Sequence, residues 1–281
     1  MTKPLRILSV NAHPHDFTHT AGTLGIHTSR GDTATVVSVT AGTQTHNEKL
    51  HDELMKPVEE QDPAIVNQSE DEIAAIKDKE LRDACAVFGV SDVRVLGFPQ
   101  PFRLSRYPEA VDKIAEVIQD VRPDILIMQS PYTRSHQGRS GVTADDHTET
   151  ALATLEAKGE ASRPRPGSRP HSIATTLFPG VYFEKNDHDF IVDISDWFEQ
   201  RVKAEAYYVS QGHTEDWSRR RMLVMLGYPG WFTGTLYAEG FVRERPELVP
   251  AIPMSELTLR KATESVEERH DRMVGKAGKD F

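Results

Sequence analysis

A short polar turn between an apolar run and a helix start constrains the fold of this chain more than any other feature. Residues 5–10 (Leu-Arg-Ile-Leu-Ser-Val) predict a buried strand, and the small residues 20–24 predict the start of a helix. The turn between them carries His13, His15 and Asp16. A strand, a turn and a helix in this order are typical of α/β proteins, whose ligands bind at the carboxyl ends of parallel strands. We therefore expect a binding site at this turn.

The chain continues as alternating predicted strands and helices. β-Branched residues predict a strand over 33–40, and apolar runs predict strands over 93–96 and 124–128. Apolar residues at helical spacing predict helices over 70–89 and 108–121. Repeated units of this kind, with right-handed crossovers, favour an α/β, Rossmann-like fold: a mostly parallel sheet flanked by helices, with a helical C-terminal third.

Length and charge limit the domain organisation and the partners. We find no convincing boundary within residues 1–281 and expect a single domain, with a charged C-terminal tail from about residue 257. The formal net charge of −10 argues against nucleic acid and against anionic lipid surfaces as partners. A small-molecule substrate is the expected partner, and the sequence leaves open whether the chain forms a homo-oligomer.

The sequence also carries indications of the cellular compartment. Residues 1–4 (Met-Thr-Lys-Pro) lead straight into the first strand, without a signal peptide. No apolar run approaches the roughly 20 residues that span a bilayer. Cys85 is the single cysteine and cannot form an internal disulfide, which is compatible with a reducing cytoplasm. We therefore expect a cytoplasmic protein that does not bind membranes.

A second polar cluster follows the predicted strand 124–128. Asp145, Asp146 and His147 open the next helix, which places them at the same edge of the sheet as the first cluster. Taken alone, a histidine in the first turn of a helix is usually structural, and either aspartate could serve as a helix cap. Two such clusters at one sheet edge favour metal binding instead.

A metal site built from both clusters would use His13, Asp16 and His147. Two imidazoles and one carboxylate suit Zn²⁺ or another divalent metal. Three protein ligands leave coordination positions for water or substrate, which is typical of catalytic zinc sites and not of structural ones.

These motifs resemble those of the PIG-L or LmbE-like deacetylase superfamily. Residues 12–17 (Ala-His-Pro-His-Asp-Phe) are similar to the family's opening motif A-H-P-D-D-E, and residues 144–147 are similar to its second motif, H-P-D-H-R-A. The late segment 237–241 (Tyr-Ala-Glu-Gly-Phe) is also similar to family sequences, so the resemblance spans roughly residues 5–241. The resemblance implies a metal, generally zinc, held by the residues named above.

The chain departs from the family motifs at three positions that matter for catalysis. His15 stands where the family has its general-base aspartate, and Phe17 stands where it has a glutamate. Ala144 replaces the family histidine that assists transition-state charge. The resemblance therefore implies metal binding without the usual deacetylase base.

Two enzymatic interpretations follow. The first is a zinc-dependent hydrolase that removes an acetyl or related acyl group from a small polar, negatively charged substrate, with His15 as the base. The second is a metal-dependent hydratase of an unsaturated carboxylic acid, similar to the 4-oxalomesaconate hydratase branch, with Glu48 and a nearby histidine as the acid/base pair. A third interpretation is a family member that binds a metal or ligand without turnover.

Further candidate site residues lie in two polar loops. Residues 42–67 are predicted to form a long loop that covers the metal and contributes Glu48 to the pocket. Asp146 is a candidate catalytic residue, and Arg134 and Arg139 are candidates for binding an anionic substrate. A neutral His in place of an Asp would make the site one charge unit more positive, which also favours anionic substrates.

Overall fold

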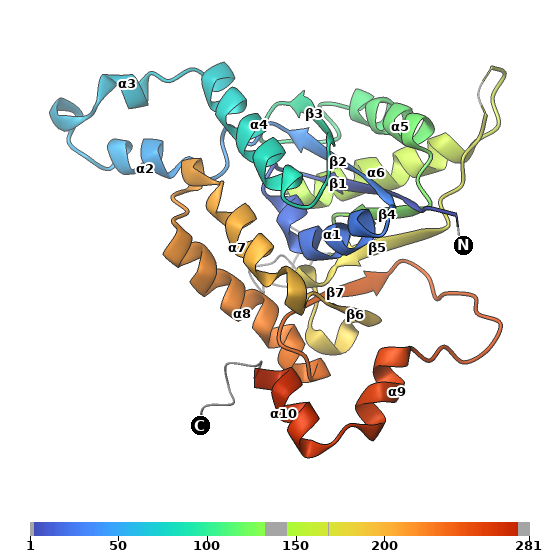
Figure 1. The fold of residues 1–281 in the computed structure, drawn as a ribbon. Coiled ribbons are helices and arrows are strands. Elements are labelled where there is room, and N and C mark those ends of the chain that lie inside the picture. Colours follow the sequence, from blue (N-terminus) through green and yellow to red (C-terminus); the bar gives the residue numbers. More distant parts are fainter. Residues whose placement is uncertain (1–2, 133–144, 168, 275–281) are drawn as a thin grey trace.

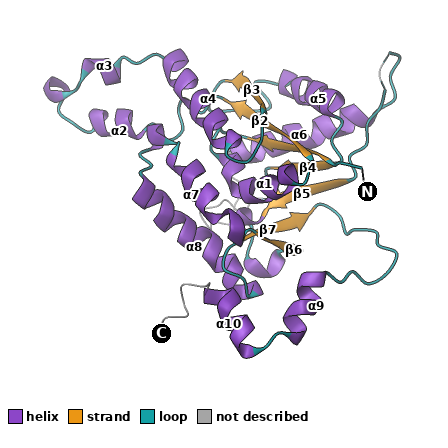
Figure 2. Cartoon of the chain, viewed as in Figure 1, coloured by secondary structure: helices purple, strands orange, loops and turns teal. Residues whose placement is uncertain are grey.

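The computed structural model describes residues 3–132, 145–167 and 169–274. Within these residues a seven-stranded sheet forms the centre of the molecule, with helices on both faces (Figures 1 and 2). The strands are β1 (Arg6–Asn11), β2 (Thr33–Thr40), β3 (Asp92–Phe98), β4 (Ile125–Met128), β5 (Thr175–Pro179), β6 (Phe190–Asp193) and β7 (Ala238–Arg243). Their order across the sheet is β3-β2-β1-β4-β5-β7-β6.

The sheet is parallel from β3 to β5, and β7 runs antiparallel to its neighbours β5 and β6. This arrangement confirms the mostly parallel, Rossmann-like sheet predicted from the sequence. Both faces of the central strands are buried: Ile7 packs in one apolar cluster, whereas Leu8 and Val10 pack in the other. Burial on both faces explains why the first strand is almost continuously apolar in sequence.

Helices cover the two faces of the sheet as two separate layers. The helices are α1 (Ala21–Ser29), α2 (Glu48–Leu54), α3 (Pro63–Val66), α4 (Glu70–Ala86), α5 (Glu109–Val121), α6 (Asp146–Ser162), α7 (Phe198–Ala206), α8 (Glu215–Thr233), α9 (Glu256–Thr263) and α10 (Val266–Val274). Helices α5 and α6 supply the apolar cluster on one face, and α1, α4 and α7 contribute to the cluster on the other.

The direction of the strand order reverses between β1 and β4. From β1 the chain continues to β2 and β3 on one side, and it then returns through α5 to β4 on the other side. At such a switch point the connections after two neighbouring strands diverge, which leaves a crevice at their carboxyl ends. Both predicted metal clusters follow these two strands, so the topology brings them to one crevice.

Two segments differ from the sequence-based expectations in detail. Residues 42–67, predicted as a loop, contain α2 and α3 because Asn47 and Asp62 cap these helices with their side chains. The C-terminal third contains the predicted helices and also the strands β6 and β7. Glu239 of β7 is buried although charged, which obscured the strand pattern in the sequence.

The charged C-terminal segment forms the exposed helices α9 and α10, which lie below β6 in Figure 1. Lys261 of α9 donates a hydrogen bond to the carbonyl oxygen of Thr233 at the end of α8. Across the described residues, no helix has both the length and the apolar character that a membrane crossing requires.

Candidate metal centre

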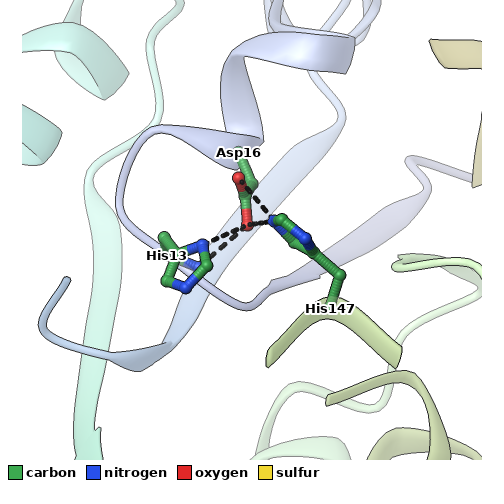
Figure 3. A group of neighbouring side chains, drawn as sticks. All are labelled: His13, Asp16 and His147. Carbon is green, nitrogen blue, oxygen red and sulfur yellow. Dashed lines mark hydrogen bonds and ion pairs between the residues drawn. The ribbon is translucent and has the colours of Figure 1, made fainter. Parts of the chain in front are cut away.

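The side chains of His13, Asp16 and His147 meet at the switch point (Figure 3). Nδ1 of His13 lies 3.5 Å from Oδ2 of Asp16, and Nε2 of His147 lies 3.3 Å from the same oxygen. Bonds of about 2.0–2.2 Å to a tetrahedral metal place neighbouring ligand atoms roughly 3.3–3.6 Å apart. The three residues therefore fit the requirements of a divalent metal ion.

Local hydrogen bonds hold the turn after β1 in this shape. Oδ2 of Asp16 accepts a hydrogen bond of 2.9 Å from the backbone N–H of His13, which closes the turn. The same oxygen accepts a second hydrogen bond, of 3.0 Å, from Nε2 of Gln129, which lies directly after β4. At the second cluster, the side chain of Asp145 caps α6 by accepting a hydrogen bond of 2.7 Å from the backbone N–H of Thr148. This cap fixes His147 in the first turn of the helix. The ligand atoms are thus set by rigid elements.

Asp146 lies behind His13 as seen from the other two metal-site residues. Its Oδ2 is 3.1 Å from Nε2 of His13, so the other ring nitrogen of His13 faces Asp16. The carboxylate also accepts hydrogen bonds from Gln100, Phe102 and Arg103, at 2.9, 2.9 and 3.0 Å. Carboxylates that bind the second nitrogen of a ligand histidine fix its tautomer and orientation. These contacts favour an orienting role for Asp146 over the direct catalytic role expected from the sequence.

The charges of the three metal-site residues depend on one another. Burial opposes ionisation of Asp16, but His147 and His13 outweigh it and hold the pKa of Asp16 well below its ordinary value. Burial likewise disfavours a charged His13, yet Asp16 and Asp146 outweigh it and raise the pKa of His13 to about 9. His13 therefore carries a proton at neutral pH, and a metal ion bound at this site would have to displace it.

The metal-site residues open into a cavity of about 300 Å³. Glu48 lines it, as the sequence predicted, at the start of α2. Its side chain is 43% exposed, and Oε1 lies 3.1 Å from Nδ1 of His46. Arg134 and Arg139 lie outside the described residues.

Lys77 of α4 also lines this cavity, although the sequence analysis did not select it. It is buried, and its Nζ donates 3.1 Å hydrogen bonds to the carbonyl oxygens of Thr45 and His46. Burial lowers its pKa. Lys77 lies four residues after Ile73 and four before Leu81, both buried on the same helix face. A lysine at an apolar position of a helix was therefore a sequence signal for this residue.

His15 pairs with a carboxylate that the sequence analysis missed. Its Nε2 lies 2.9 Å from Oε1 of Glu205 on α7, and both side chains are buried. Burial opposes a charge on Glu205, but His15, Arg221 and Arg201 outweigh it and hold the pKa of Glu205 well below its ordinary value. The pair joins positions 190 residues apart, and no sequence pattern links them.

His213 completes a second group of potential ligands, with His15 and Glu205. Nδ1 of His213 donates to the backbone carbonyl oxygen of Glu205 at 3.1 Å, and burial lowers the pKa of His213 to about 4. However, Nε of Arg221 lies 3.3 Å from the Glu205 carboxylate. A guanidinium at this distance opposes a second cation, so we treat this group as a hydrogen-bonded support for His15.

Sequence comparisons find relatives among de-N-acetylases. The model of the family described as GlcNAc-PI de-N-acetylase (PIG-L) matches residues 8–158, more than half of the chain. The chain is 27% identical over 191 residues to the 1D-myo-inositol 2-acetamido-2-deoxy-alpha-D-glucopyranoside deacetylase of Thermomonospora curvata, covering 62% of this chain and 59% of that protein. It is 27% identical over 209 residues to a probable N-acetyl-alpha-D-glucosaminyl L-malate deacetylase 2 of Bacillus cereus, covering 73% and 83%. The chain thus spans about three-fifths of the length of the first of these relatives.

Comparison with solved structures finds the same fold at low sequence identity. GalB, the 4-carboxy-2-hydroxymuconate hydratase of Pseudomonas putida KT2440, aligns with a TM-score of 0.68 and 18% identity, over 89% of this chain and 100% of that one. The N,N'-diacetylchitobiose deacetylase of Pyrococcus horikoshii aligns with a TM-score of 0.66 and 22% identity, over 89% and 88%. At these identities the likeness concerns the fold alone.

Metal binding is expected to release about one proton at pH 7.5, because a charged His13 must become neutral to bind the ion. Calorimetric titration of the protein with Zn²⁺ in buffers of different ionisation enthalpy measures this release. His147→Ala should weaken binding at least about tenfold, since it removes a ligand. His51→Ala is the control, because that side chain is 75% exposed and outside the cavity lining. A binding heat that is independent of the buffer would contradict the expectation.

Asp146→Asn is expected to lower metal affinity about 10- to 100-fold, because the charge that holds Nε2 of His13 is lost while the shape is kept. Competition with a chromophoric chelator measures the affinity. Asp52→Asn is the matched control, at a side chain that is 83% exposed. Unchanged metal affinity together with lost turnover would contradict the orienting role and favour the direct catalytic role.

Proposed function

Since the chain belongs to the GlcNAc-PI de-N-acetylase (PIG-L) family, we propose that it is a metal-dependent hydrolase that removes an acetyl or related acyl group from the nitrogen of a small anionic substrate. The observation that carries this proposal is the convergence of His13, Asp16 and His147 in the lining of a cavity of about 300 Å³. Two imidazoles and one carboxylate with open positions suit Zn²⁺ in a catalytic role.

Zn²⁺ at this site would act as a Lewis acid toward the amide carbonyl and lower the pKa of a water molecule to about 7. The side chains of this protein hold the ion and set the direction of its ligands. Asp146 fixes the ring of His13, and Gln129 fixes the carboxylate of Asp16. Such preorganisation reduces the reorganisation needed when the reaction occurs.

His15 is the residue we propose as the proton acceptor. The ionised Glu205 accepts a hydrogen bond from Nε2–H of His15, which leaves Nδ1 as the basic nitrogen. Nδ1 of a histidine is two bonds from Cβ, as are the carboxylate oxygens of an aspartate. His15 can therefore present a base close to where the family's aspartate would. Glu205 also stabilises the imidazolium that forms when the proton is taken up.

The charges around the cavity support an anionic substrate. Glu205 restores a negative charge behind His15, so the replacement of aspartate by histidine does not by itself make the region more positive. The preference rests instead on Lys77 and Arg221, which line the cavity. The ammonium group of Lys77 already donates hydrogen bonds to two backbone carbonyl groups. Arg221 is therefore better placed to bind a substrate carboxylate, and its side chain is 29% exposed.

A hydratase acting on an unsaturated carboxylic acid is the second candidate function. The pair Glu48–His46 on the cavity wall favours it, because hydration needs one group to take up a proton and another to return it. This pair does not include His15, so the two functions use different acid/base residues.

Assays on the metal-loaded protein distinguish the candidates. The substrates are N-acetylated amino sugars with and without a carboxylate, and unsaturated dicarboxylic acids. We expect release of acetate together with a free amine, faster for the anionic substrates. Acetate is measured by a coupled enzymatic assay and the amine by fluorescent labelling.

Loss of conjugated ultraviolet absorbance without fragmentation would instead support the hydratase, above all if Glu48→Gln slows it at least about tenfold. Tight metal binding with neither reaction, across a broad panel of both substrate classes, would favour a non-catalytic ligand-binding role.

His15→Ala is expected to lower kcat at least about tenfold with the metal retained, because general-base catalysis typically contributes about 10²–10⁴ in rate. Glu205→Gln should lower kcat about tenfold or more, because the orienting negative charge is lost while the side-chain shape stays the same. Steady-state kinetics and metal analysis of each variant measure both effects.

Glu199→Gln is the matched control for Glu205→Gln, since Glu199 is on the same helix with a 67% exposed side chain. Full activity of metal-loaded His15→Ala would refute the base role. Loss of the metal from that variant would make His15 a ligand.

A further inference from the structure

A second cavity, of about 260 Å³, lies beside the one at the metal site. It is lined by α8, β7, the segment 180–188, one residue of α7, and Thr18 and His19 just after the metal-site turn. Figure 1 shows α7 and α8 side by side next to the β6–β7 edge of the sheet. His19 and Arg221 line both cavities, so the two are adjacent. The volume is slightly below the roughly 300–1,000 Å³ of typical small-molecule pockets.

The walls of the second cavity are mainly apolar. Met222 and Leu226 of α8 contribute buried side chains, and Ala238 of β7 contributes a third. Val181 and Phe183 line it from the segment after β5. A ligand that fills this space therefore needs an apolar body.

Arg201 is the most deeply buried of the cationic side chains in this lining. It projects from α7, and its side chain is only 3% exposed. Its Nε lies 3.2 Å from Oε1 of Glu239, but its Nη1 is buried and has no hydrogen-bond partner among the described residues. Buried donors are nearly always paired, so a buried guanidinium N–H without a partner points to an absent acceptor.

Glu239 cannot complete this pairing, because its carboxylate is already occupied at the start of α1. It accepts hydrogen bonds of 2.9 and 2.8 Å from the backbone N–H groups of Gly22 and Thr23, and 2.7 Å from the hydroxyl group of Thr23. Arg201 therefore keeps donor capacity after its ion pair with Glu239 has formed.

The charges that line the cavity favour a single negative charge. Arg201 is paired with Glu239, and Arg221 with Glu205, whereas Lys185 at the cavity lies 3.4 Å above the ring of Phe232. The described lining thus keeps a net positive charge. A carboxylate matches the planar fork of a guanidinium.

We propose that the second cavity binds an apolar group that ends in a carboxylate, with the carboxylate at Nη1 of Arg201 and the apolar chain against Met222 and Leu226. This cavity would hold the part of the substrate that is remote from the scissile amide. In this respect the inference rests on the function proposed above. The substrate class that follows is an N-acylated compound with an apolar carboxylic acid arm.

Binding of hexanoate tests the proposal without turnover. Hexanoate is titrated calorimetrically into the full-length, metal-loaded protein, and hexanol is the uncharged comparison with the same chain length. We expect hexanoate to bind at least about tenfold more tightly than hexanol, because a charge-assisted hydrogen bond forms only with the carboxylate. Equal affinities for the two compounds would overturn the proposal.

Two variants locate the site of binding. Val181→Trp fills the cavity from a half-buried position and should weaken hexanoate binding at least about tenfold. Arg201→Lys keeps a positive charge beside Glu239 but loses the guanidinium fork, and it should also weaken binding. Val58→Trp is the control, since Val58 is 81% exposed and outside the cavity lining.

The outcomes separate this inference from the proposed function. Hexanoate affinity that is unchanged in Val181→Trp but lost in His147→Ala would mean coordination at the metal site and would overturn the inference. Binding that depends on Val181 and Arg201 supports the cavity even if no amide is hydrolysed, in which case only the proposed function fails.

Discussion

The burial of an ionised carboxylate at the crevice between β1 and β4 is the constraint on which the site depends. A buried charge is unfavourable unless hydrogen bonds and opposite charges compensate it. Asp16 obtains this compensation from the backbone of His13, the side chain of Gln129 and the imidazole of His147. These groups come from the turn after β1, the end of β4 and the first turn of α6. The charge of Asp16 therefore fixes three segments relative to one another. A divalent ion bound here would take the place of the proton on His13 that now faces the Asp16 carboxylate.

The same requirement explains how the chain accommodates a histidine at position 15. An aspartate there would carry its own negative charge, whereas a histidine needs a partner for one nitrogen. Glu205 on α7 supplies that partner at 2.9 Å, so the negative charge lies on the residue that pairs with position 15 and not on position 15 itself. In the proposed mechanism a histidine–carboxylate pair thus takes the place of a single carboxylate as the base.

The sequence predicts those parts of the site that local patterns encode. His13, Asp16 and His147 follow strands whose apolar runs are recognisable, and parallel strands bring their carboxyl ends together. Lys77 had a weaker signal, a charge at a buried helical position. Glu205 had no such signal, because its role depends on the packing of α7 against the turn that holds His15. Long-range contacts of this kind follow from tertiary packing, and a single sequence carries no pattern for them.

Helix α7 connects the two cavities through a single turn of its backbone. Arg201 and Glu205 are four residues apart, so they lie on the same face of the helix. Glu205 reaches His15 at the metal cavity, whereas Arg201 lines the second cavity and pairs with Glu239. Glu239 in turn binds the first turn of α1, which follows directly from the metal-site turn. A change in the position of α7 would therefore alter the proposed base and the proposed subsite together, and would couple substrate selection to catalysis if both proposals hold.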